Sequence, residues 1–201
     1  NGGSVNFYKP TTLASAAPVS TKLLGISAGT AGAIIFHKDV QLASPTLAVS
    51  LSSQGAQSGS TYVGAGGAIE FKGKIESGVV PGIGTMVPQG LTLDSTGTVP
   101  GAITLRDSVG SVANPLARLT LTGPMQIALE AAEINLRATS GDVLTASSTL
   151  GTPTLVLGAA NTDIRVTGGT VNGVTGYADY KQETFHIGVK DATARSLSIT
   201  A

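Results

Sequence analysis

The chain has 201 residues, with twelve basic and twelve acidic side chains and no cysteine. A net charge of zero offers no basic surface to displace counterions from a phosphate backbone, which argues against nucleic acid as a partner, and the absence of cysteine excludes disulfides and thiolate metal sites. No apolar run approaches the roughly 18 residues that a membrane-spanning helix needs, so no membrane span is expected.

Short runs in which apolar and polar residues alternate recur along the chain, and they are rich in Val, Ile, Leu, Thr and Phe. This alternation is typical of half-buried strands, so we expect an all-β protein. The same run returns at intervals of a few tens of residues, which indicates a stack of similar units. The sequence therefore predicts a single β-solenoid domain over 1–201, built from about five degenerate modules near 4–28, 32–52, 67–93, 101–122 and 183–201, with an irregular region at 123–180.

One position of these modules is aromatic. The chain has four phenylalanines, and each ends the first alternating run of a module: Phe7, Phe36, Phe71 and Phe185. The fourth module carries Leu105 at this position. Because equivalent positions of stacked modules point the same way, we expect these five residues to form one interior column.

Each module is expected to turn twice. Continued alternation after the first run would place Lys38, Gly73 and Asp107 on the apolar face, where unpaired polar groups are costly, so the strand should bend there. A second corner is expected at three prolines, which lack a backbone N–H donor: Pro45, Pro81 and Pro115.

Two parts of the chain depart from this pattern. Residues 52–60 and 62–67 are expected to form a loop or hairpin insertion. Within the irregular region, the segment Pro124–Ala138 fits a helix in having proline near its first turn and Arg137 four residues after Glu133. Its Asn135 and the surrounding threonines favour strands, and both interpretations stay open at this point.

The fourth module and the segment after it also resemble a known family. The residues that carry the resemblance are Gly101–Leu105, Val109, Asn114–Thr122, Ile127–Leu129 and Ile134–Ala138. This pattern is similar to the repeats of filamentous-haemagglutinin-like and autotransporter-like secreted bacterial adhesins. The resemblance implies a β-solenoid, most simply a right-handed β-helix, that is extracellular or at a bacterial cell surface.

The charged and histidine residues give little sign of catalysis. His37 and His186 each follow a module phenylalanine, where the other modules carry Tyr8, Lys72 and Arg106, so this row is expected to face solvent. Asp163 and Arg165 share one face of a strand, but a hydrolase or lyase needs several such groups converging in a cleft. Three further charged residues are interpreted as surface charges or a local ion pair: Glu130, Glu133 and Arg137. We expect no catalytic residues, no metal site and no cofactor.

Exposed aromatic side chains are the usual contacts for carbohydrate. Tyr177 and Tyr180 flank Asp179 within four residues, which makes this loop the best candidate for a surface contact with cell-surface or matrix polysaccharide. The competing interpretation is a turn that closes the last module.

The two ends of the chain carry alternating runs with no polar cap. Val5 and Phe7 lie in the first run, and Leu197 and Ile199 lie in the last. Uncapped strands expose unpaired backbone groups, so we expect copies of the chain to associate end to end through these four residues. The expected function is therefore a non-catalytic extracellular structural protein, either a filament subunit or a segment of an adhesin shaft. The alternatives are a β-helical domain that binds or cleaves polysaccharide, and a pilin-like subunit that donates the strand Gly3–Phe7.

Overall fold

The computed structural model describes residues 3–14, 24–27, 32–137, 142–167, 170–171, 174–175, 186–189 and 196–200. All regular elements in these ranges are β-strands, and most of the strand pairs are parallel. This confirms the predicted all-β class. Within the same ranges, no helix is long and apolar enough to cross a membrane.

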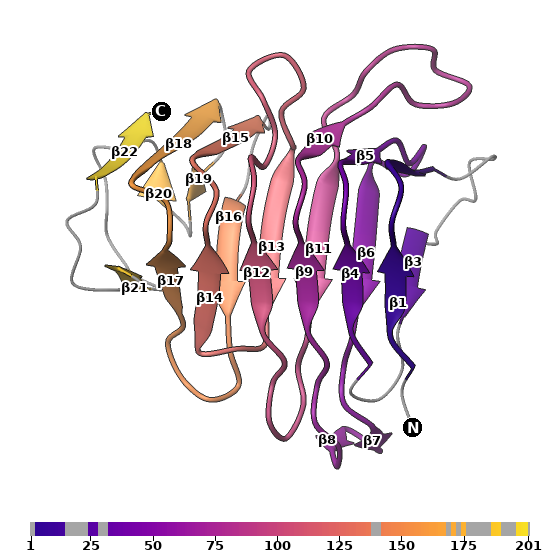
Figure 1. Ribbon diagram of the computed structural model, residues 1–201, viewed down its shortest axis with the longest axis vertical. Helices are drawn as coiled ribbons and strands as arrows, with labels where there is room; N and C mark the ends of the chain where they lie inside the picture. The colour runs from indigo at the N-terminus through magenta and orange to yellow at the C-terminus, as the bar shows by residue number, and fades with distance from the viewer. Residues whose placement is uncertain are drawn as a thin grey trace.

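The strands form three main sheets (Figure 1). The first sheet contains, in spatial order, β1 (Val5–Phe7), β4 (Ile34–Phe36), β9 (Ile69–Phe71), β12 (Ile103–Leu105), β14 (Gln126–Leu129), β17 (Thr154–Leu157) and β21 (His186–Val189). The third sheet contains β3 (Leu24–Ser27), β6 (Ala48–Ser52), β11 (Gly90–Asp94), β13 (Arg118–Thr122), β16 (Asp142–Ser147), β19 (Thr170–Val171) and β20 (Val174–Thr175).

The second sheet consists of two groups of three strands. One group contains β2 (Thr11–Leu13), β5 (Val40–Leu42) and β10 (Ile75–Ser77), and the other contains β15 (Glu133–Arg137), β18 (Asn161–Thr167) and β22 (Ser196–Thr200). Val109 joins the groups, since it forms one parallel bridge with Ile75 and another with Ile134.

The chain visits these sheets in a fixed rotation. It passes from the first sheet to the second and then to the third, as in β1, β2 and β3, and repeats this order with β4, β5 and β6. The segment 123–180, which has no clean sequence copy, contributes β14 to β20 to the same sheets in the same order. Figure 1 shows β4, β9 and β12 of the first sheet running opposite to β6, β11 and β13 of the third, with β1 and β22 at opposite ends of the row.

The first sheet aligns its apolar residues in columns that cross all of its strands. Phe7, Phe36 and Phe71 are Cα partners on successive strands, and the column continues through Leu105, Leu129 and Leu157. The rings of Phe7 and Phe36 are stacked with centroids 4.4 Å apart, and those of Phe36 and Phe71 with centroids 4.7 Å apart. The predicted interior column is thus confirmed at Phe7, Phe36, Phe71 and Leu105.

The last member of the predicted column needs correction. Phe185 lies outside the described residues, and the register pairs Leu157 with Val189. Val189, four residues further along the chain, therefore holds the column position that the sequence pattern gave to Phe185.

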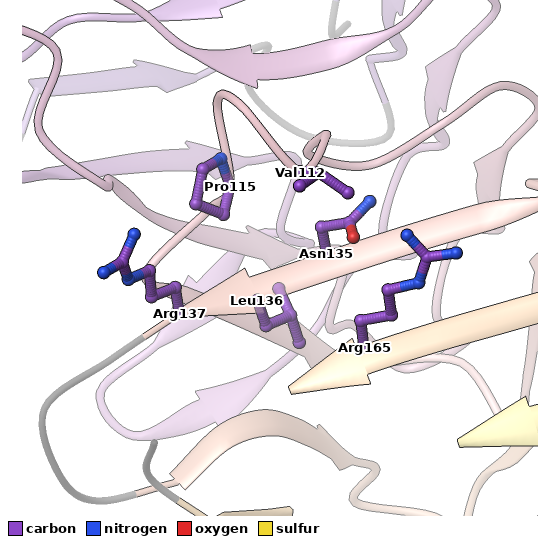
Figure 2. A pocket seen from close by; sticks show the side chains of 6 residues that line it. All are labelled: Val112, Pro115, Asn135, Leu136, Arg137 and Arg165. Carbon is purple, nitrogen blue, oxygen red and sulfur yellow. The ribbon is translucent and has the colours of Figure 1, made fainter. Parts of the chain in front are cut away.

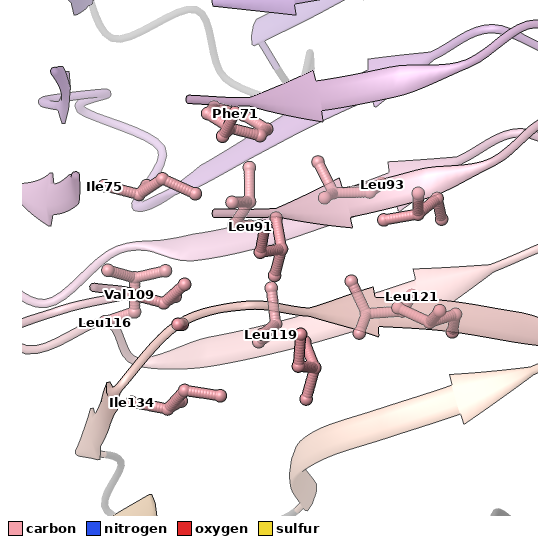
Figure 3. Packing of buried hydrophobic residues seen from close by; sticks show 14 of the residues in the cluster. Phe71, Ile75, Leu91, Leu93, Val109, Leu116, Leu119, Leu121 and Ile134 are labelled. Atoms are coloured by element: carbon pink, nitrogen blue, oxygen red, sulfur yellow. The ribbon is translucent and has the colours of Figure 1, made fainter. Parts of the chain in front are cut away.

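Columns from all three sheets meet in one core. On the third sheet Leu91 and Leu119 are partners, as are Leu93 and Leu121, and all four are buried. Figure 3 shows these leucines beside Phe71 and beside the second-sheet column of Ile75, Val109 and Ile134. Strands such as β4, β6, β9 and β11 thus bury alternate residues, as the period-two pattern requires.

The predicted turning points are confirmed. The backbone bends at Lys38, Gly73 and Asp107, and a strand or bridge of the second sheet follows each bend. The prolines predicted for the second corner all lie outside strands: Pro45, Pro81 and Pro115.

The insertion and the ambiguous segment are also settled. The insertion contains an antiparallel hairpin of β7 (Gln57–Ser58) and β8 (Thr61–Tyr62), with Gly59 at a φ of 62° in its turn. The segment that admitted a helix contains β14 and β15 instead. Alternate residues there, such as Ile127 and Leu129, are needed in the first-sheet columns, so tertiary packing overrides the helical signals.

Candidate functional site

The strands nearest the N-terminus form an open edge of all three sheets. β1 pairs with β4, β2 with β5, and β3 with β6, and within the described residues none of the three has a partner on its other side. An edge strand presents a row of unpaired N–H and C=O groups that can pair with another strand. This edge is the structural feature best suited to binding a further strand.

The apolar side chains at this edge are only partly covered. Val5 and Phe7 are half-buried and pack against the core, whereas their partners Ile34 and Phe36 are fully buried. The ring of Phe7 stacks on Phe36 on one side. The N-terminal edge therefore combines free backbone groups with apolar surface.

The two residues predicted for the opposite end lie on a different sheet. Leu197 and Ile199 belong to β22, the last strand of the second sheet, where they are paired with Thr162 and Ile164. Val5 and Phe7 belong to the first sheet, whose last strand is β21. The four predicted residues thus lie at opposite ends of the molecule but not in matching sheets.

The row that follows the first-sheet strands faces outward, as predicted for Tyr8, His37, Lys72 and Arg106. Tyr8 is 68% exposed and stacks on the ring of His37, with centroids 4.4 Å apart, and the Nε2 atom of His37 lies 3.2 Å from the Oδ1 atom of Asn6. His186 does not belong to this row, contrary to the prediction, because it is the first residue of β21 and the Cα partner of Thr154. Four strands separate β21 from β4. Within one chain, the two histidines are therefore too far apart to share a metal ion.

Further along this row, Arg106 joins two acidic residues of neighbouring strands. Its Nε atom donates to Glu70 and its Nη1 atom to Glu130, each over 2.5 Å. The hydrogen bond with Glu70 raises the pKa of Arg106, with a further contribution from Glu130, while burial acts in the opposite direction. Because these side chains are partly exposed, the two ion pairs of Arg106 contribute little to the stability of the fold.

Asp163 and Arg165 form an ion pair on β18. The Nη2 atom of Arg165 lies 2.7 Å from Oδ2 of Asp163, and its Nη1 atom lies 3.6 Å from Glu133 on the neighbouring strand. The Oδ1 atom of Asp163 is buried and has no hydrogen-bond partner. Glu133 and Arg137 lie at the two ends of β15, and four residues of a strand span about 13 Å. Glu133 therefore forms an ion pair with Arg165 of the neighbouring strand instead of with Arg137.

A pocket of about 200 Å³ opens beside this ion pair (Figure 2). It is lined by Val112, Pro115, Asn135, Leu136, Arg137 and Arg165. The lining contains two cations but no carboxylate or histidine, and the Nδ2 atom of Asn135 already donates to the carbonyl oxygen of Gly110. The pocket therefore lacks the acid and base that sugar hydrolysis requires.

The remaining two expectations concern a polysaccharide contact and a metal site. Tyr177, Asp179 and Tyr180, the candidate polysaccharide contact, lie outside the described residues. In the part of the chain that the structure does describe, no group of three or more His, Cys, Asp or Glu side chains is placed to hold a metal ion.

Comparisons with models of protein families, with curated proteins and with solved structures gave no match.

Proposed function

We propose that the chain is a non-catalytic extracellular structural protein in which the three sheets form a right-handed β-solenoid. It associates end to end with copies of itself as a filament subunit, or it forms a segment of a bacterial adhesin shaft. The observation that carries this proposal is the parallel, in-register stacking of short strands, which leaves parallel strand edges at both ends of the first and second sheets. Stacking of this type is extended by translation along one axis and does not close on itself.

Charge and chemistry support the same proposal. The formal net charge is zero, so long-range repulsion between copies is weak. The partly exposed carboxylates of Glu70, Glu130 and Asp163 are held in ion pairs with Arg106 and Arg165. The resemblance of 101–138 to secreted adhesin repeats supports a location outside the cell or at its surface.

The alternatives have less support. A pilin-like subunit would donate Gly3–Phe7 to another chain, whereas β1 is paired in parallel with β4 of its own chain. A domain that binds or cleaves polysaccharide would use the pocket beside Arg137 and Arg165, which carries no general acid or base.

Self-association predicts a concentration-dependent mass. In light scattering, the wild-type chain is expected to grow in average mass with concentration, and Val5→Lys or Ile199→Lys to reduce this growth, because each places a charge at an apolar end. Thr104→Lys is the matched control, since it adds the same charge on the lateral face of the first sheet, and it should leave the growth unchanged. A wild-type chain that stays monomeric at high concentration would contradict the filament proposal.

The proposal also predicts no turnover of polysaccharide. Incubation with uronate and neutral polysaccharides is expected to release no reducing ends and no unsaturated products. Turnover that is lost on changing Asp163 or Arg165 would show that the ion pair on β18 is part of an active site.

A further inference from the structure

We propose a specific geometry for the junction between copies: β21 of one copy pairs with β1 of the next, and β22 pairs with β2, both in parallel and in register. The third sheet does not continue across the junction. This inference rests on the end-to-end association proposed above and identifies the strands and rows that carry it.

The first-sheet register defines one half of the junction. The Cα partners run from Asn6 to Ile35, Glu70, Thr104, Ala128, Val156 and finally Gly188. Translation of a second copy along this row places its Asn6 beside Gly188, its Val5 beside Ile187 and its Phe7 beside Val189. The aromatic and aliphatic columns of the core then continue from one copy into the next, and the half-buried ring of Phe7 gains a partner on its open side.

The second sheet defines the other half in the same way. Its central row runs from Thr11 through Val40, Ile75, Val109, Ile134 and Ile164 to Ile199. The same translation places Thr11 of the next copy beside Ile199, and Thr12 beside Thr200. Ile199 therefore meets β2 of the next copy and not Val5 or Phe7, because those two residues belong to another sheet.

The third sheet ends differently at its far side. β20 pairs with β19 in an antiparallel hairpin and occupies the last position of the sheet. This corrects the expectation that neither end carries a cap. A parallel β3 from the next copy finds no parallel strand there, so the first two sheets carry the junction.

Engineered disulfides test this geometry, because the natural chain has no cysteine. The double variants Asn6→Cys/Gly188→Cys and Thr12→Cys/Thr200→Cys each place two thiols in one row at opposite ends of the molecule. Seven strands about 4.8 Å apart put Asn6 and Gly188 roughly 29 Å from each other within one chain, well beyond the about 4–7 Å between Cα atoms that a disulfide allows. Any disulfide between them must therefore join two copies.

Both variants are expected to give a ladder of covalent oligomers on a non-reducing gel after mild oxidation. An equimolar mixture of the single variants Asn6→Cys and Gly188→Cys should give covalent dimers and no longer species. Two controls should give several times less product: Asn6→Cys/Thr200→Cys joins different sheets, and Gly25→Cys/Thr175→Cys joins the two ends of the third sheet. Circular dichroism of the reduced variants checks that each has kept its fold.

The outcomes separate the inference from the proposed function. Association in light scattering without ladders from the two designed pairs, or with stronger ladders from either control, would overturn the junction geometry and leave self-association standing. A chain that neither associates nor cross-links would overturn both. Ladders from the two designed pairs alone would establish the junction.

Discussion

Replacement of Phe71 by alanine is expected to lower the free energy of unfolding by about 3–5 kcal/mol. Phe71 is fully buried, its ring stacks on Phe36, and its Cα partner on the other side is Leu105. Removal of the ring leaves a cavity in the middle of the column, where strands on both sides hold the backbone in place. Phe71→Leu should cost less than Phe71→Ala, because leucine already occupies this column at Leu105.

Urea denaturation followed by far-ultraviolet circular dichroism measures this loss. Thr104→Ala is the control, since Thr104 lies on the neighbouring strand β12 but is not buried, and it is expected to change the free energy little. A loss below about 1 kcal/mol for Phe71→Ala would mean that the aromatic column does not hold the core together.

Replacement of Gly101 by alanine is expected to destabilise the protein by about 1–3 kcal/mol, or more if the backbone cannot adjust. A Cβ atom on Gly101 would collide with the carbonyl group of Gly67, which precedes the neighbouring strand β9. A Cβ atom on Gly67 would collide in the same way with the carbonyl group of Gly32. Gly32, Gly67 and Gly101 therefore lie next to one another in successive modules. The nearest obstacle is a backbone carbonyl oxygen in both cases, and it cannot move aside as a flexible side chain would.

Gly90→Ala is the matched control for this substitution. A Cβ atom on Gly90 would have its nearest neighbour at 3.6 Å, an ordinary contact. Alanine also has fewer conformations than glycine in the unfolded chain, so Gly90→Ala should be neutral or slightly stabilising. Equal effects of the two substitutions on the urea midpoint would show that the close approach of the module glycines is not what limits their replacement.

The strands, their bends and most of the aromatic column could be predicted from the sequence because phenylalanine is rare in this chain. Phenylalanine at the same position of three modules fixed the alignment of Phe7, Phe36 and Phe71. In β14 and β17 the same column carries Leu129 and Leu157. Leucine is too common here to mark a register, so 123–180 looked irregular although β14 to β18 pair in parallel like the earlier strands.

The same reasoning explains the error at Phe185. The sequence pattern assigned the aromatic residue Phe185 to the column, whereas the pairing of β17 with β21 places Val189 beside Leu157. Local alternation also does not tell which sheet a run joins. For this reason the end-to-end contact predicted from the sequence joined Val5 and Ile199, although these residues belong to different sheets.

The charged groups required the tertiary structure. Arg106 lies 36 residues from Glu70 and 24 residues from Glu130 in the chain, so no local motif connects them. Their outward position could be predicted from the repeat, because Arg106 follows Leu105 as Lys72 follows Phe71.

Electron microscopy of the purified protein over a range of concentrations tests the central claim most directly. The account predicts rods that join end to end into unbranched fibres, with Val5→Lys giving shorter particles at equal concentration. Separate globular particles at the highest concentration, with no end-to-end contacts, would contradict the claim that this chain forms an extending structural assembly.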